Sequence, residues 1–257
     1  MAKGSSGFLD KFTHKRVLSR WASAAKAARS AELAQLKRQR DAARDLRGPL
    51  NELIHVAEGR LALPRIGSNS FPRPSGSLWA WRPQVWRGPL SQHGMASVQT
   101  KTRLGDEVGV FHDCGVSELT LRQVRNTREE DLAPFGIRFD VFNFKGSFLS
   151  LVLDFPADAI DGLKKKHILR VSPVIETESP IEVFLRLNIK NGPNTEQLVQ
   201  EVQVNQENAV AEFDLAYTDL NEKRLGSIWL DVIFENPRMN QIIVRDITLC
   251  RYPRAEL

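Results

Sequence analysis

Cysteine is scarce in this sequence. Cys114 and Cys250 are the only two cysteines among 257 residues. Two are too few for a disulfide framework, and their spacing matches no metal-binding motif. Such sparse cysteine is typical of a reducing compartment, so we expect a cytosolic protein with free thiols. A bridge between Cys114 and Cys250 stays open as the alternative, for a chain exported by a non-standard route.

Long hydrophobic runs and catalytic motifs are also missing. No apolar stretch approaches the roughly 18–20 residues that span a bilayer. No apolar segment of secretory-signal length follows the basic residue near the start, so we expect no signal peptide. We find no P-loop, metal cluster or nucleophile motif. The composition, 42% hydrophobic and 26% charged, excludes collagen-like and wholly disordered chains and is typical of a soluble globular protein.

Positive charge is concentrated in the first third of the chain. Residues 1–90 contain 17 Lys and Arg against 6 Asp and Glu, whereas the rest of the chain contains 19 against 25. Abundant Ala, Lys and Arg and the lack of proline predict a helix over residues 10–47. We expect Gly48-Pro49 to end this helix, and a shorter amphipathic helix to follow at residues 50–61.

The basic helix over residues 10–47 has three interpretations. In the first, which we favour, it is a solvated helix that docks on its own domain or on a partner. In the second, it makes peripheral contact with an anionic membrane surface. Its apolar stripe is rich in alanine, which buries little area and disfavours deep insertion. In the third, it binds nucleic acid, which we disfavour because aromatic residues do not alternate with the basic ones. The stripe consists of Val17, Trp21, Ala25 and Ala28.

Residues 63–91 form a connector rich in proline and tryptophan. Five prolines in this stretch prevent a long helix or a central strand. Trp79 and Trp81 would lie on the same side of an extended segment. They could form an aromatic platform for a sugar or a partner, or they could anchor the connector to the next domain as a first strand. We favour the anchor.

From about residue 92 the hydrophobic period becomes two, which indicates strands with one buried face. We count nine or ten short strands with few helical patterns between them. The expected fold is mainly β, an antiparallel jelly-roll β-sandwich of the galactose-binding-like kind, preceded by the basic helical region. We expect Asn236-Pro237-Arg238 to join the last two strands as a hairpin. The predicted divisions are residues 1–62, 63–91 and 92–257.

Polar side chains on the outward face of the predicted strands are the candidate binding site. Planar and paired polar groups suit sugar recognition, because aromatic rings stack on sugar rings and Arg, Asp and Asn bond to hydroxyls. The alternative is a solvated sheet with cross-strand ion pairs. The candidate ligand-binding residues are Arg138, Asp140, Arg186, Asn188, Trp229 and Asp231, with Glu212 and Asp214 on the same expected face.

Two patterns could carry catalysis. The triplet His112-Asp113-Cys114 would place His112 and Cys114 on one face of a strand, but free cysteine is commonly an inert buried residue. Asp154, Asp158 and Asp161 could supply two carboxyls for glycoside hydrolysis, which requires them to face each other across a cleft. We therefore expect no catalytic residues, and we keep a carbohydrate-active enzyme as an alternative.

We expect no cofactor and no metal site. Many jelly rolls hold a structural calcium on loop carboxylates and carbonyls. No calcium-loop spacing supports such a site in this sequence. The possible donors would be Asp106, Glu107, Asp113 and Asp246.

Residues 79–257 resemble a bacterial family known only as a domain of unknown function. The segments that carry the resemblance are 132–156, 187–197, 213–217 and 245–249. The family has no established activity, so the resemblance implies no catalytic residues. The last segment, with Asp246 before Ile247-Thr248-Leu249, is also similar to the closing strand of galactose-binding-like and carbohydrate-binding-module sandwiches.

We therefore expect a non-enzymatic binding protein whose sandwich recognises a carbohydrate or a glycan-bearing partner. This expectation rests on analogy of fold. The first alternative is a structural or protein-interaction module whose basic helix docks on a partner or an anionic membrane. The oligomeric state and the open face of the sheet are left undecided.

Overall fold

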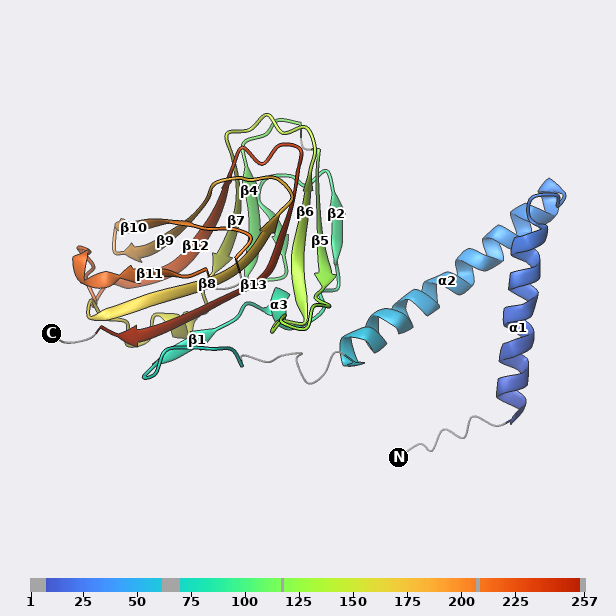
Figure 1. Ribbon diagram of the computed structural model, residues 1–257, viewed down its shortest axis with the longest axis horizontal. Coiled ribbons are helices and arrows are strands. Elements are labelled where there is room, and N and C mark those ends of the chain that lie inside the picture. Colours follow the sequence, from blue (N-terminus) through green and yellow to red (C-terminus); the bar gives the residue numbers. More distant parts are fainter. Residues whose placement is uncertain (1–7, 62–69, 117, 207–208, 255–257) are drawn as a thin grey trace. The chain divides into compact units, whose positions relative to one another are not determined.

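The chain folds into two compact units, Met1–Glu58 and Gly59–Leu257. The computed structural model describes residues 8–61, 70–116, 118–206 and 209–254. The first unit is helical and the second contains the strands (Figure 1).

The helical unit consists of α1 (Phe8–Ala27) and α2 (Leu33–Leu61). The helix break lies between them, and Pro49 lies inside α2, so the expectation that Gly48-Pro49 would end a helix is wrong. Proline removes one backbone hydrogen bond of the helix. The hydrogen bonds before and after Pro49 are enough for α2 to continue past it. At the break, the amide and the hydroxyl of Ser30 both donate to the carbonyl of Ala27 and close the end of α1.

The second unit is a sandwich of two antiparallel sheets. Sheet A contains β1 (Trp79–Trp81), β2 (Gly94–Ala96), β5 (Leu119–Arg125), β6 (Phe135–Val141), β8 (His167–Thr177), β11 (Ala211–Asp214) and β13 (Asn240–Pro253). Its order is β11-β8-β13-β6-β5-β2, and β1 pairs with β13. Sheet B contains β3 (Thr102–Leu104), β4 (Val108–His112), β7 (Phe148–Asp154), β9 (Val183–Asn191), β10 (Asn194–Val202) and β12 (Leu225–Glu235). Its order is β10-β9-β12-β7-β4-β3. This architecture confirms the predicted jelly-roll fold class.

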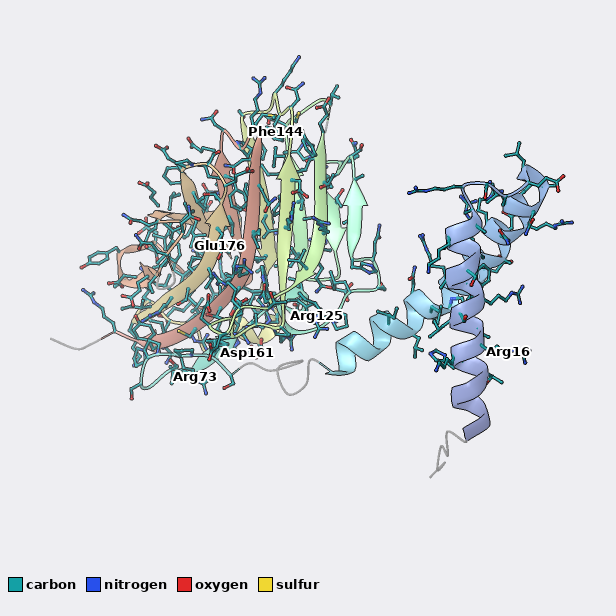
Figure 2. The ribbon with its side chains drawn as sticks, turned by 45° about the vertical axis from the view of Figure 1, so that its right-hand side comes forward. Arg16, Arg73, Arg125, Phe144, Asp161 and Glu176 are labelled. Atoms are coloured by element: carbon teal, nitrogen blue, oxygen red, sulfur yellow. The ribbon has the colours of Figure 1, made fainter. Side chains whose placement is uncertain are left out.

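The core lies between the two sheets because each strand points alternate residues inward. In β9, Leu185 and Leu187 are buried, while the alternating residues Phe184 and Arg186 point outward. Side chains from both sheets fill the interior (Figure 2). The rings of Phe139 in β6 and Phe234 in β12 approach to 6.0 Å between centroids, which joins the sheets at the middle of the core.

The connections between strands differ from the predicted ones in two respects. The strands β12 and β13 belong to different sheets, so the predicted hairpin at residues 236–238 is wrong. Asn236 and Met239 have positive φ angles of 49° and 51°, and this turn carries the chain from one sheet to the other. Twelve strands, not nine or ten, follow residue 92 in the described part of the chain, because β2, β3 and β11 have only three or four residues and show little periodicity.

The segment before residue 92 is part of the sandwich. β1 pairs with β13, and the short helix α3 (Gln84–Arg87) follows it. Trp81, Val85, Trp86 and Leu90 are all buried in the main hydrophobic core. Burial of these apolar side chains fixes the proline-rich segment against sheet A.

Candidate functional site

The polar residues that the sequence predicts on one outward face lie on two different sheets. Arg138 and Asp140 are on β6, and Glu212 and Asp214 are on β11, all in sheet A. The other four nominated residues are on β9 and β12 in sheet B. The outer faces of the sheets are opposite faces of the sandwich, so the structure does not bring the two sets together. The alternation of apolar and polar residues along a strand shows which side chains point inward and which point outward. It does not show which sheet the strand belongs to.

The sheet B residues form one compact cluster. Arg186 pairs across the strands with Asp231, and Asn188 pairs with Trp229. Arg186 Nε donates to Asp231 Oδ2 at 2.7 Å, and Asn188 Nδ2 donates to the same oxygen at 3.0 Å. Asp231 is only 4% exposed. The two hydrogen bonds offset the free-energy cost of burying its carboxylate.

Gln197 on β10 extends this cluster to a third strand. It lies opposite Asn188, and its Nε2 donates to Asn188 Oδ1 at 2.9 Å. Gln197 was not predictable from the sequence, because only the pairing of β10 with β9 places it beside Asn188. We call Arg186, Asn188, Gln197 and Asp231 the sheet B polar cluster.

Trp229 stands between polar groups on both sides. Across β9 its neighbour is Asn188, and across β7 its neighbour is Asp154. Asp154 forms an ion pair with Arg103 at 2.7 Å. The half-buried indole of Trp229 therefore has a polar side chain on each neighbouring strand, Asn188 on β9 and Asp154 on β7.

An apolar row runs beside the sheet B polar cluster, two residues further along the strands. Phe184 of β9 lies opposite Ile233 of β12, which lies opposite Ser150 of β7, and Phe111 of β4 follows. All three apolar side chains are half-buried on the outer face. The outward position of Phe184 between Val183 and Leu185 was readable from the sequence, whereas its proximity to Phe111 depends on the strand order.

The sheet A residues satisfy one another. Asp140 accepts hydrogen bonds from Arg138 Nε at 2.8 Å, from Thr120 Oγ1 at 3.1 Å and from Gln241 Nε2 at 3.3 Å. Burial raises the pKa of Asp140, but the bonds and charge of Arg138, with Thr120 and Arg122, outweigh it and hold the pKa below its ordinary value. The oxygens of the Asp140 carboxylate therefore already accept hydrogen bonds from side chains of the protein.

Trp79 and Trp81 pack on their own chain. The Trp79 ring stacks on Phe155 with centroids 6.0 Å apart and an interplanar angle of 21°. Trp81 is buried and lies 5.3 Å from the same ring. Both indoles therefore hold β1 against the sandwich in this structure.

In the triplet His112-Asp113-Cys114, the histidine and the cysteine are bonded to backbone groups. His112 Nε2 lies 2.9 Å from the carbonyl of Val98, and its Nδ1 accepts from the amide of Cys114 at 3.3 Å. The Cys114 thiol donates to the carbonyl of Val116 at 3.0 Å. Cys114 and Cys250 are both buried and free, so the alternative disulfide is not formed.

Three of the acidic residues that were named as possible calcium donors are bonded within the protein at separate places. Glu107 accepts from the amide of Gln84 at 2.5 Å, and Asp113 accepts from Ser147 Oγ at 2.6 Å. Asp246 is held by Arg82. No group of three or more His, Cys, Asp or Glu that could hold a metal ion occurs in the part of the chain that the structure describes. Of the three aspartates considered for glycoside hydrolysis, Asp154 ends β7 and Asp158 lies in the 3₁₀ turn Ala157–Ala159.

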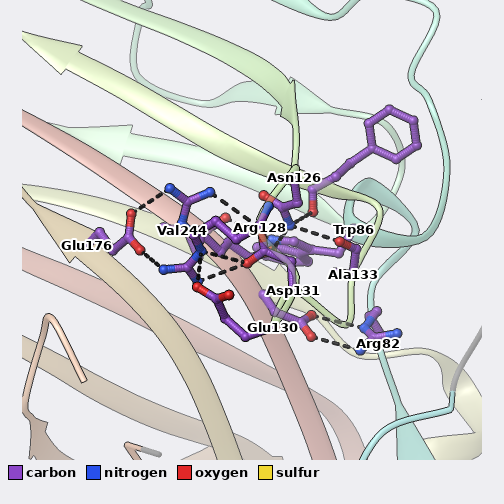
Figure 3. A network of polar contacts seen from close by, with 12 residues as sticks. Arg82, Trp86, Asn126, Arg128, Glu130, Asp131, Ala133, Glu176 and Val244 are labelled. Carbon is purple, nitrogen blue, oxygen red and sulfur yellow. Dashed lines mark hydrogen bonds and ion pairs between the residues drawn. The ribbon is translucent and has the colours of Figure 1, made fainter. Parts of the chain in front are cut away.

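A second polar network surrounds a bulge in β13 between Val244 and Asp246 (Figure 3). Trp86 Nε1 donates to the carbonyl of Val244 at 3.0 Å, and Asn126 Nδ2 donates to that of Arg245 at 2.8 Å. Arg82 Nε and Nη2 donate to the two Asp246 carboxylate oxygens at 2.9 Å and 2.8 Å. Burial raises the pKa of Asp246, and the Arg82 charge opposes this shift. The network satisfies the backbone that the bulge leaves unpaired.

A family model matches residues 1–257 and is described as a family of unknown function, DUF6478. The chain belongs to this family. The match confirms the predicted membership of a family without a known function. It also shows that DUF6478 includes the basic helices, whereas the resemblance in the sequence began at residue 79.

Several solved structures are similar to this chain at low sequence identity and low TM-score. The tailspike protein 4 enzymatically active domain of bacteriophage CBA120 matches with a TM-score of 0.42 and 6% identity, over 62% of this chain and 21% of that one. A family 11 carbohydrate-binding module from Clostridium thermocellum matches at 0.39 and 15%, over 65% and 100%. A xylan-binding family 22 module from Paenibacillus barcinonensis matches at 0.36 and 9%, over 63% and 94%. This DUF6478 chain thus spans about a fifth of the tailspike chain, and no curated protein matches it.

Proposed function

We propose that the protein is a non-enzymatic carbohydrate-binding protein and that the outer face of sheet B is its binding face. The observation that carries the proposal is Trp229 beside the sheet B polar cluster, with Asp154 on its other side. An indole face accepts the apolar face of a sugar ring, and surrounding polar side chains accept and donate to its hydroxyls.

Arg186 is the donor that we assign to a sugar hydroxyl. Only its Nε is bonded within the described residues, to Asp231, and 39% of its side chain is exposed. The bond to Asp231 holds the guanidinium in place, so less side-chain entropy is lost when a ligand binds. The terminal nitrogens of Arg186 then remain for two hydroxyl oxygens.

The other face and the enzymatic alternative are less well supported. Asp140 on sheet A is already bonded by three side chains, so it offers little to a ligand. Hydrolysis of a glycosidic bond requires one carboxyl to act as an acid and a second as a base or nucleophile. On sheet B, Asp154 and Asp231 each form an ion pair with an arginine, so both carboxylates are already engaged within the protein.

A protein ligand on the same face is the second candidate function. The apolar row formed by Phe111, Phe184 and Ile233 favours it, together with Phe148, which is 37% exposed. We also propose that the protein works in the cytoplasm, which the two free cysteines support.

A glycan array with the full-length protein tests the proposal. We expect saccharide binding by the wild type, at least tenfold weaker binding by Trp229→Ala and Arg186→Ala, and unchanged binding by Arg138→Ala on the opposite face. Circular dichroism verifies that each variant is folded. Loss of binding in Arg138→Ala alone would overturn the assignment to sheet B, and no binding by the wild type to any glycan would overturn the function.

A further inference from the structure

The helices α1 and α2 carry a large excess of positive charge. Residues 8–61, which include both helices, contain twelve Lys and Arg against six Asp and Glu, a net charge of +6. This is more than the net charge of +5 of the whole protein. A charge of this density attracts anionic surfaces and is screened by salt.

An exposed apolar stripe runs along the second half of α2. Leu46, Leu50, Leu53 and Ile54 recur at i, i+4, i+7 and i+8, so they share one face of the helix. Each is between 40% and 63% exposed. Exposure of four adjacent aliphatic side chains to water costs free energy in proportion to their apolar area. We therefore infer that another surface covers this stripe.

Most charges of α2 are sorted onto two stripes, and Arg38 lies on the side of the acidic one, three residues before Asp41. The first stripe is basic, at spacings of three and four residues, and consists of Lys37, Arg40, Arg44 and Arg47. The second is acidic and consists of Asp41, Asp45 and Glu52, spaced by four and seven residues. With 3.6 residues per turn, the apolar, basic and acidic stripes each take about a third of the circumference. The helix can therefore present its apolar and basic sides to one surface and direct its acidic side away from it.

Helix α1 and the start of α2 continue this character. Val17 and Leu18 are 48% and 56% exposed, with Lys15, Arg16 and Arg20 close to them in sequence. In the described residues, no helix is long and apolar enough to cross a membrane. Apolar side chains flanked by basic ones on a helix of this type are typical of binding in the plane of a lipid surface.

We propose that helices α1 and α2 bind the surface of membranes that contain anionic lipid. Lys37, Arg40, Arg44 and Arg47 contact the headgroups, and the leucines of α2 enter the boundary between headgroups and acyl chains. Nucleic acid phosphates would neutralise the same basic residues, but they would leave the leucine stripe in water. The lipid surface is the occupant that satisfies both stripes, and this inference is independent of the carbohydrate proposal.

Co-sedimentation of the full-length protein with vesicles tests the inference. We use vesicles of phosphatidylcholine alone and of phosphatidylcholine mixed with phosphatidylglycerol, at low and high NaCl. Binding is expected to the mixed vesicles, to weaken at high salt and to be much weaker with phosphatidylcholine alone. We expect Arg40→Glu with Arg44→Glu to weaken binding by roughly tenfold or more. The uncharged double variant Leu50→Gln with Leu53→Gln should also lose binding, because it removes apolar contact.

A charge-matched control separates the helical unit from the protein's net charge. The exposed residues Lys145 and Lys223 lie on the sandwich, and Lys145→Glu with Lys223→Glu changes the total charge by the same amount as the arginine pair. This control must bind as the wild type does. Equal loss in the control, full binding by the leucine variant, or binding to double-stranded DNA without binding to anionic vesicles would each overturn the inference.

Discussion

Arg82 places a charge in the interior of the sandwich. Its side chain is fully buried and bonds both oxygens of Asp246. A buried ion pair adds little to the stability of the fold compared with two apolar side chains of the same size. Removal of one partner is strongly destabilising, because the other charge is then buried without a partner. The pair ties the segment after β1 to the bulge of β13.

We therefore predict that Arg82→Met lowers the free energy of unfolding by about 3–5 kcal/mol. Arg138→Met is the matched control, since its ion pair with Asp140 lies on the outer face, and it should cost no more than about 1 kcal/mol. Urea denaturation of both variants measures the difference. Equal losses would contradict the structural role of the buried pair.

His167 makes stability depend on pH. It is buried at the start of β8, and its Nδ1 accepts from the amide of Lys164 at 3.1 Å. Burial lowers the pKa of His167 below 6.5, and the positive charges of Arg251, Lys166 and Lys164 lower it further, against Glu222. The folded state therefore binds its proton less readily than the unfolded state.

The contribution of His167 to stability is complete above the unfolded pKa of about 6.5 and declines as the pH falls through that value towards the folded pKa. We predict that His167→Gln removes this part of the pH dependence. Urea denaturation between neutral and mildly acidic pH measures it as the difference between the wild type and the variant. A difference that stays constant with pH would show that His167 is not the group responsible.

At the scale of elements, local patterns predicted strands well and boundaries less well. The alternation at residues 135–141 matches β6, and the helical composition of residues 10–47 matches α1 and much of α2. Pro49 did not end a helix, because one missing hydrogen bond is outweighed by the continuous bonds around it. The end of α1 depends instead on the capping of Ala27 by Ser30.

The candidate site was predictable only in part, and for a physical reason. Outward positions follow from the period of two, which is local, and this placed Arg186, Asn188, Trp229 and Asp231 on an outer face. Their proximity depends on the pairing of β9 with β12, which the chain connects through β10 and β11. The same pattern put Arg138 and Asp140 outward in the other sheet. Period alone contains no information on strand order.

At the scale of the whole molecule, the boundary between the units lies well before the first strand. The unit Gly59–Leu257 contains β1 and α3, and Trp81, Val85, Trp86 and Leu90 are in its core. Each of these large apolar side chains contributes about 1.5–3 kcal/mol by its burial.

Two truncations test this boundary. We predict that removal of residues 1–58 leaves the thermal midpoint of the sandwich unchanged, whereas removal of residues 1–90 lowers it strongly or prevents folding. Differential scanning calorimetry of both proteins gives the comparison. A stable sandwich without residues 59–90 would contradict the assignment of Trp81 and Trp86 to its core.

Strand β13 pairs with β8 along most of its length, with β6 through residues 240–244 and with β1 through residues 249–251. During synthesis on the ribosome, β1, β6 and β8 emerge long before the strand that joins them. Sheet A therefore has unpaired edges until residues 240–253 have left the exit tunnel. Such edges favour association between nascent chains. Sheet A is therefore completed only when β13 pairs with β8, β6 and β1.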